Sequence, residues 1–180
     1  MAATTQKIIG ETPAEEKTKN PNASKPRYIW IDAAANFPDF ANSKENIARD
    51  LALAKDAGFT DIVVDVRPTT GDVLFKTNLV DQVKFMYAWI GSNYTKVERT
   101  ATWDYLQAFV DEARKQGLRI HAAINTFVGG NQIDGGTGLL YRDQSKAEWA
   151  TQMNMQVGIT SVMNTSESTK FFNPAHPEVQ

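Results

Sequence analysis

Cysteine is absent from the 180-residue sequence, and histidine occurs only at His121 and His176. The absence of cysteine excludes disulfides, thiol chemistry and cysteine-containing zinc sites. With only two histidines, we expect no metal ion and no other cofactor. No run of about 18 apolar residues occurs, so we expect no membrane-spanning helix. The formal net charge of -2 gives no reason to expect a nucleic-acid partner.

The start of the chain differs in composition from the rest. Residues 1–26 are polar, with scattered proline, lysine and glutamate, and they lack the continuous apolar core of a secretory signal. Over the whole sequence, hydrophobic residues make up 42% and charged residues 22%, which is typical of globular proteins. We therefore predict a disordered leader over 1–26 and a folded region over 27–180.

Strand and helix patterns alternate after the leader. β-Branched and aromatic residues predict strands over 27–33, 59–68 and 119–125. Helical periodicity occurs over 42–57 and 102–116. Each of these helices is followed by a glycine suited to a C-cap, Gly58 or Gly117. The alternation predicts a parallel sheet with its strands adjacent in sequence order, whereas residues 69–100 are predicted to form a long, aromatic-rich loop.

The predicted strands each have one aliphatic face and one face that becomes polar toward the carboxyl end. Buried parallel strands are normally aliphatic on both faces, so this repeated polarity suggests a shared polar centre. Five polar positions carry the pattern: Asp32, Asp65, Arg67, His121 and Asn125. A (β/α)₈ barrel has its active site at the carboxyl ends of its strands, so the pattern favours the start of a barrel. A doubly wound sheet does not predict one consistently polar face.

Each candidate residue also has a structural interpretation. Asp65 and Arg67 can form an ion pair with each other. His121 can be a hydrogen-bonded core histidine, and Asp32 can cap the loop that follows it. Asp72, in the segment TTGDVLF, can be a turn aspartate.

Aromatic residues gather in the segment predicted to be a loop. They can line a platform for sugar rings, or they can form a hydrophobic lid over a barrel. The residues in question are Phe85, Tyr87, Trp89 and Tyr94.

Several motifs resemble those of the bacterial glycosyl-hydrolase-like family 10 proteins. The segments RYIWID, DIVVDVRPTTGDVLFKTN, EARKQGLRIHAAIN and FFNPAHPEV occur in the order found in that family, from about Arg27 to the end of the chain. The resemblance implies a (β/α)₈ barrel and a glycosidase located outside the cytoplasm. Ala123, Thr126 and Asp65 stand where that family has an aromatic residue, a proline and an amide.

The resemblance also implies roles for individual residues. It suggests contact with a carbohydrate substrate for Asp32, Arg67, His121 and Asn125. Glycoside hydrolysis usually needs two carboxyl groups. The catalytic residues stay unassigned, with Asp65 and Asp72 as local candidates.

The length of the chain limits this interpretation, because a barrel of this type needs roughly 250 residues. We therefore predict an α/β fold made of the first three to four βα units of a truncated barrel. Such a chain is expected to be inactive alone, and to associate with a missing carboxyl-terminal half or with itself. The alternative function is a non-catalytic, carbohydrate-binding or structural barrel fragment. Another barrel enzyme, such as an aldolase, is disfavoured because the predicted strands contain no lysine for a Schiff base.

Overall fold

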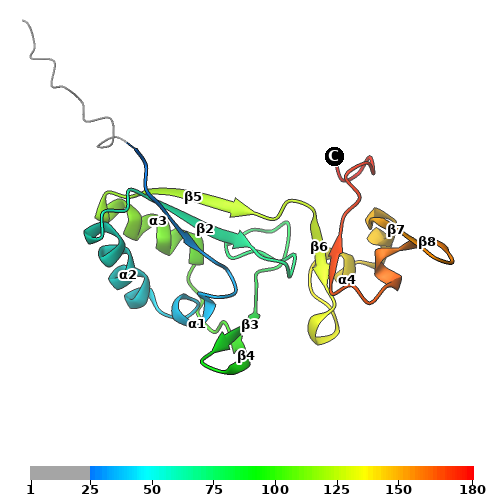
Figure 1. Cartoon of the computed structure of the whole chain (residues 1–180), viewed down its shortest axis with the longest axis horizontal. Coiled ribbons are helices and arrows are strands. Elements are labelled where there is room, and N and C mark those ends of the chain that lie inside the picture. Colours follow the sequence, from blue (N-terminus) through cyan, green and yellow to red (C-terminus); the bar gives the residue numbers. More distant parts are fainter. Residues whose placement is uncertain (1–24) are drawn as a thin grey trace, which may run out of the picture.

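The computed structural model describes residues 25–180, so the disorder predicted for residues 1–24 lies outside the described part. Its first part is a parallel sheet of three strands in the order β1–β2–β5. The strands are β1 (Tyr28–Ile31), β2 (Asp61–Arg67) and β5 (Arg119–Ile124). This pairing in sequence order is the one that the sequence predicts. Helices α2 (Lys44–Asp56) and α3 (Tyr105–Gln116) lie along one face of the sheet (Figure 1).

Local signals define the ends of these helices. Ser43 caps α2 by accepting a hydrogen bond from the backbone N–H of Asn46, and Asp104 caps α3 in the same way through Gln107. Gly117 ends α3 with a φ of 64°, in the left-handed region that favours glycine. The sheet and the helices therefore begin and end close to the positions that the sequence indicates.

The core of this part lies between the sheet and its two helices. One apolar face of each helix packs against the aliphatic face of the sheet, and the short helix α1 (Phe37–Phe40) closes one end. Phe109 meets Phe40 edge-on, with ring centroids 5.4 Å apart. The buried side chains at the centre of this core include Ile47, Leu51, Ile62, Val64, Val66 and Phe109.

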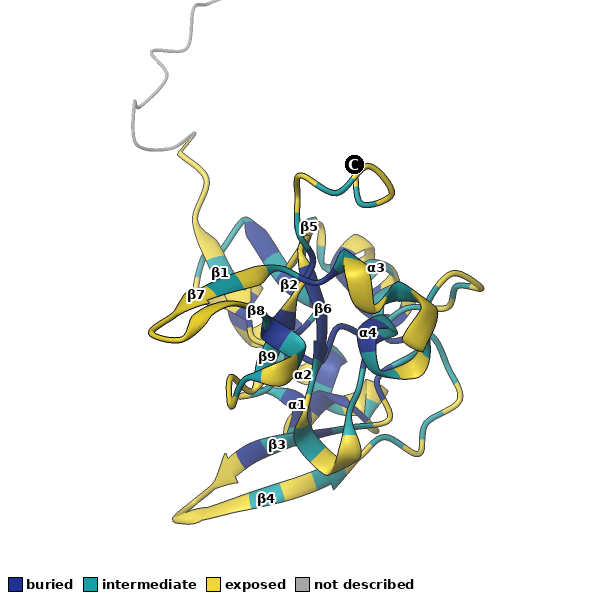
Figure 2. Ribbon diagram, turned by 90° about the vertical axis from the view of Figure 1, so that its right-hand side faces the viewer, coloured by how far each residue is buried: buried dark blue, intermediate teal, exposed yellow. Residues whose placement is uncertain are grey.

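The remaining strands form small antiparallel pairs. Strands β3 (Phe85–Ile90) and β4 (Asn93–Glu98) make a hairpin, β6 (Val128–Asn131) pairs with β9 (Thr169–Phe171), and β7 (Gln152–Met155) pairs with β8 (Gly158–Ser161). Helix α4 (Leu139–Arg142) and the 3₁₀ turns η1 (Ile133–Gly135), η2 (Gln144–Trp149) and η3 (Val162–Asn164) complete this part. A second, smaller core contains Leu140, Ala150, Val162 and Phe172. Much of the surface of β4, β7 and β8 is exposed (Figure 2).

The predicted partial (β/α)₈ barrel is therefore wrong. A barrel would continue after β5 with a covering helix and another parallel strand, but the chain turns into the antiparallel pair β6–β9. Residues 126–138 contain five glycines and no helical periodicity, so this segment cannot supply that helix. One consequence is that Ile124, on the last strand of the sheet, remains 56% exposed.

The loop predicted over residues 69–100 contains the β3–β4 hairpin instead. Met86 and Ala88 are buried while Tyr87 and Trp89 face the other side, which is the period-2 alternation of a half-buried strand. Gly91, with a φ of 59°, begins the two-residue connection between the strands. The alternation and the Gly-Ser connection were both present in the sequence, so its local pattern was compatible with a hairpin.

No helix between residues 25 and 180 is long and apolar enough to cross a lipid bilayer.

Helix α2 offers a matched test of the core. Leu51 is 1% exposed and Leu53 is 60% exposed. We expect Leu51→Ala to lower the free energy of unfolding by about 2–5 kcal/mol, because it leaves a cavity in the core. The control Leu53→Ala should change it by less than about 0.5 kcal/mol. Urea denaturation followed by circular dichroism measures both values. Equal effects of the two substitutions would contradict the packing of α2 described above.

Candidate functional site

His121 belongs to a polar cluster at the amino end of the sheet. The buried carboxylate of Asp61 accepts hydrogen bonds from Arg119 Nε and Nη2 at 2.7 Å each, and it lies 2.9 Å from His121 Nε2. Thr60 Oγ1 also donates to this carboxylate. The Arg119 hydrogen bonds hold the pKa of Asp61 well below its usual range. The imidazole of His121 also packs against the ring of Tyr28, at a centroid distance of 5.5 Å. These contacts give His121 a structural role.

Arg67 and Asn125 lie together, but they bind each other's backbone. Arg67 Nη1 donates to the carbonyl oxygens of Asn125 and Thr126, and Nη2 donates to that of Val128. In return, Asn125 Nδ2 donates to the Arg67 carbonyl at 2.8 Å. Arg67 therefore fastens the segment after β5 to the end of β2.

Asp32 and Asp65 hold the backbone at the carboxyl ends of their strands. Asp32 Oδ1 accepts from the N–H groups of Ala34 and Ala35, at 2.8 and 2.7 Å. Asp65 Oδ1 accepts from the N–H of Arg67 at 3.2 Å. Burial, with a smaller contribution from the charge of Asp32, raises the pKa of Asp65. Asp32 therefore caps the loop that follows β1, whereas Asp65 has its partner at the end of its own strand.

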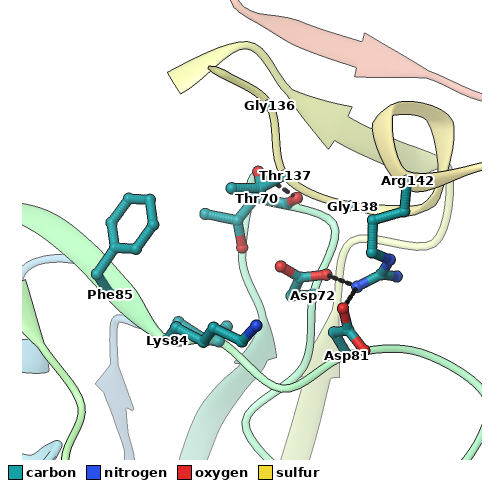
Figure 3. A pocket seen from close by; sticks show the side chains of 10 residues that line it. Thr70, Asp72, Asp81, Lys84, Phe85, Gly136, Thr137, Gly138 and Arg142 are labelled. Atoms are coloured by element: carbon teal, nitrogen blue, oxygen red, sulfur yellow. Dashed lines mark hydrogen bonds and ion pairs between the residues drawn. The ribbon is translucent and has the colours of Figure 1, made fainter. Parts of the chain in front are cut away.

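Asp72 is the sequence candidate that lines a cavity (Figure 3). This cavity of about 180 Å³ lies between the segment that follows β2 and a glycine-rich loop, residues 129–138, that leads into α4. We call this segment the glycine loop. Its polar and aromatic lining includes Thr70, Asp72, Asp81, Lys84, Phe85 and Arg142. The sequence analysis did not single out Asp81, Lys84 or Arg142, because nothing in their local pattern distinguishes them from ordinary surface charges.

The charges around this cavity are linked through one guanidinium group. Arg142 Nη1 donates to Asp72 Oδ1 at 2.9 Å and also forms an ion pair with Asp81. Burial raises the pKa of Asp72, and the charge of Arg142 opposes that rise. Because both carboxylates share one nitrogen of Arg142, they lie on the same side of the cavity and hold its wall in place.

Glycines allow the two parts of the chain to meet at this cavity. Gly71 has a φ of 80°, and a Cβ there would lie 3.0 Å from the backbone nitrogen of Gly130. A Cβ on Gly138 would lie 2.6 Å from the carbonyl oxygen of Gly129. Thr137 Oγ1 donates to the Thr70 carbonyl at 2.8 Å and joins the two segments. The glycine-rich loop thus serves close backbone packing.

An aromatic strip leads away from the cavity along one face of the β3–β4 hairpin. It consists of Phe85, Tyr87, Trp89 and Tyr94, and Phe85 also lines the cavity. The rings of Tyr87 and Tyr94 are stacked at 5.4 Å, and those of Trp89 and Tyr94 lie 5.3 Å apart. The strip is therefore a row of neighbouring aromatic rings that ends at a polar cavity.

Polar contacts hold the strip to the glycine loop. Lys96 Nζ lies 4.1 Å from the ring centroid of Phe85 and 2.7 Å from Asp134 Oδ2. Tyr87 donates from its hydroxyl to Asp134 Oδ1 at 3.1 Å. Asp134 therefore links the hairpin to the loop on the other side of the cavity.

Among residues 25–180, no group of three or more histidine, aspartate or glutamate side chains is arranged to hold a metal ion.

Comparison with known proteins yields one distant relative and no family assignment. The chain is 28% identical over 164 residues to an S-layer-related protein of Niallia circulans, a match that covers 88% of this chain and 10% of that protein. The chain thus spans about a tenth of the length of this relative. No protein-family model matches the chain, and no solved structure matches it.

These findings correct the family resemblance drawn from the motifs. The glycosyl-hydrolase-like assignment is wrong, because the relative is an S-layer-related protein and the strands after β5 do not continue a barrel. Three of the four quoted motifs lie in β1, in β2 with the loop after it, and across α3 and β5, so they reflect the βα pattern of a parallel sheet. The fourth, FFNPAHPEV, begins at the end of β9 and lies outside that sheet. The expectation of a glycosidase, which rested on this resemblance, loses its support.

The Asp61 cluster predicts a specific dependence of stability on pH. A carboxyl group whose pKa is lowered on folding stabilises the folded state above its unfolded pKa, and this contribution is lost as the pH falls toward the folded pKa. We expect Asp61→Asn to lower the melting temperature at pH 7. The difference from the unmodified chain should shrink as the pH falls below about 4, since the ordinary pKa is 3.8. The exposed Asp56 provides the control Asp56→Asn, which should have little effect at either pH. A pH-independent difference in thermal melts would argue against this role of Asp61.

Proposed function

We propose that this chain is a non-catalytic glycan-binding module of a large cell-surface protein. The observation that carries the proposal is the aromatic strip that ends, at Phe85, in a polar cavity. Figure 3 shows the lining of this cavity. Sugar rings combine apolar C–H faces with hydroxyl groups. They therefore pack on aromatic side chains and need fixed polar groups beside them.

The two parts of the site meet these requirements separately. Trp89 and Tyr94, near the hairpin tip, are 68% and 57% exposed and offer ring surface to a ligand. The cavity offers carboxylates, a guanidinium, an ammonium and threonine side chains. Its volume of about 180 Å³ is below the 300–1,000 Å³ of pockets for drug-sized ligands, so it suits a single sugar ring.

The carboxylates of the cavity favour binding over catalysis. Hydrolysis of a glycosidic bond usually needs two carboxyl groups that flank the bond, one of them able to give a proton. Asp72 and Asp81 instead share one guanidinium nitrogen of Arg142. Asp65, the other candidate, accepts a hydrogen bond from the backbone at its own strand end.

The relative supports the cell-surface part of the proposal. Its name relates it to S-layers, and this chain matches only a tenth of its length. We therefore infer an extracytoplasmic location, in which the module would contribute glycan contacts to a much longer polypeptide.

Substitution of Trp89 tests the proposed platform. Trp89→Ala should weaken binding to bacterial cell-wall glycan fragments by on the order of tenfold, because the lost apolar contact is about 1–2 kcal/mol. Folding should be unaffected, since the side chain is largely exposed. Isothermal titration calorimetry measures the affinity, and thermal melts check the fold.

A matched control lies on the sheet. Trp30 is 58% exposed and is not part of the strip, so Trp30→Ala should leave the affinity unchanged. Incubation with the same fragments should release no new reducing ends. Equal loss of affinity in both tryptophan variants would contradict the platform, and release of reducing ends would contradict the non-catalytic assignment.

A further inference from the structure

One buried hydroxyl group in the cavity wall has no partner in the described part of the chain. Thr70 is 6% exposed, and its Oγ1 makes no hydrogen bond with any residue from 25 to 180. Figure 3 shows this side chain directed into the cavity. A buried polar atom without a partner is unfavourable, so a ligand that reaches it gains a hydrogen bond that the protein does not supply.

Lys84 is the second group that faces the cavity without a charged partner. Within residues 25–180, no carboxylate lies within ion-pair distance of its Nζ, whereas Arg142 pairs with Asp72 and Asp81. Figure 3 shows the Lys84 side chain extending along the cavity on the same side as Thr70. The carboxylates of the cavity are thus already neutralised in part, while one ammonium group is not.

From these two groups we infer the class of ligand. We propose that the sugar unit in the cavity carries an acidic substituent, a carboxylate or a phosphate, which binds Lys84 Nζ and Thr70 Oγ1. Both groups can donate hydrogen bonds, and anionic oxygens are the strongest acceptors for them. Asp72 and Asp81 lie between this position and Arg142 (Figure 3), and their ion pairs with Arg142 reduce the repulsion that they would exert on an anion. The inference rests on the proposed glycan-binding function and adds the charge of the ligand to it.

The experiment compares acidic glycans with their neutralised forms. Bacterial cell-wall glycan fragments are tested as isolated, after chemical reduction of their carboxyl groups, and after removal of their phosphate groups. We expect the 180-residue chain to bind the untreated fragments about tenfold more tightly than one of the treated forms, because a charge-assisted contact is lost. The treatment that weakens binding identifies the acidic group. The preference should also decrease at high salt.

Three variants place the effect in the cavity. Lys84→Gln should abolish the preference for acidic fragments, and Thr70→Val, which keeps the shape of the side chain, should reduce it. Lys76→Gln removes an exposed lysine outside the cavity lining and should change nothing. Thermal melts confirm that each variant is folded.

The possible outcomes separate the two proposals. Equal affinity for treated and untreated fragments, with Trp89→Ala still weakening binding, would overturn the acidic ligand and leave the glycan platform standing. A preference for acidic fragments that survives Lys84→Gln would also overturn this inference. Absence of binding to every form would overturn the glycan-binding function itself.

Discussion

The contact between the end of β2 and the segment after β5 determines how the rest of this structure is arranged. Arg67 donates to three backbone carbonyl groups beyond β5, those of Asn125, Thr126 and Val128. Beside it, Gly71 packs against the backbone of Gly130 at a distance that excludes a side chain. A guanidinium group that binds backbone carbonyls is satisfied without a carboxylate partner, and it directs the chain away from the sheet. The antiparallel part therefore begins at this contact, and the cavity forms where the two parts meet.

The uncovered surfaces of the parallel sheet follow from the same arrangement. Helices α2 and α3 cover one face, and the other face keeps Tyr28 and Trp30 more than half exposed. On that face, the cluster around Asp61 pairs its charged groups at the amino end of the strands. This cluster accounts for polar side chains on a strand without requiring a ligand.

The candidate site combines elements that are far apart in the sequence. The aromatic strip comes from a hairpin inserted between β2 and α3, and Arg142 comes from the segment after β6. The three carboxylates that the sequence suggests for chemistry, those of Asp32, Asp65 and Asp72, are all bound to backbone or to Arg142. Carboxylates held in this way position the backbone or neutralise the charge of Arg142, which agrees with a binding module more than with an acid–base enzyme. The groups without partners in the described part of the cavity, Thr70 Oγ1 and Lys84 Nζ, are the ones available to a ligand.

Short-range patterns in the sequence determined the three parallel strands, the two covering helices and their caps. Alternation with period 2 and 3.6, and glycine at helix ends, act within a few residues and are visible without coordinates. The same patterns led to the incorrect prediction of a barrel, because a βα unit at the start of a barrel has the same sequence pattern as a βα unit in an isolated sheet. The glycine-rich sequence after β5 argues locally against a further βα unit, but where that segment goes is decided by the long-range contacts of Arg67 and Gly71, which no local pattern reveals. The tertiary structure alone also assigned His121 to Asp61 and Asp72 to Arg142, since these pairs are separated by 60 and 70 residues.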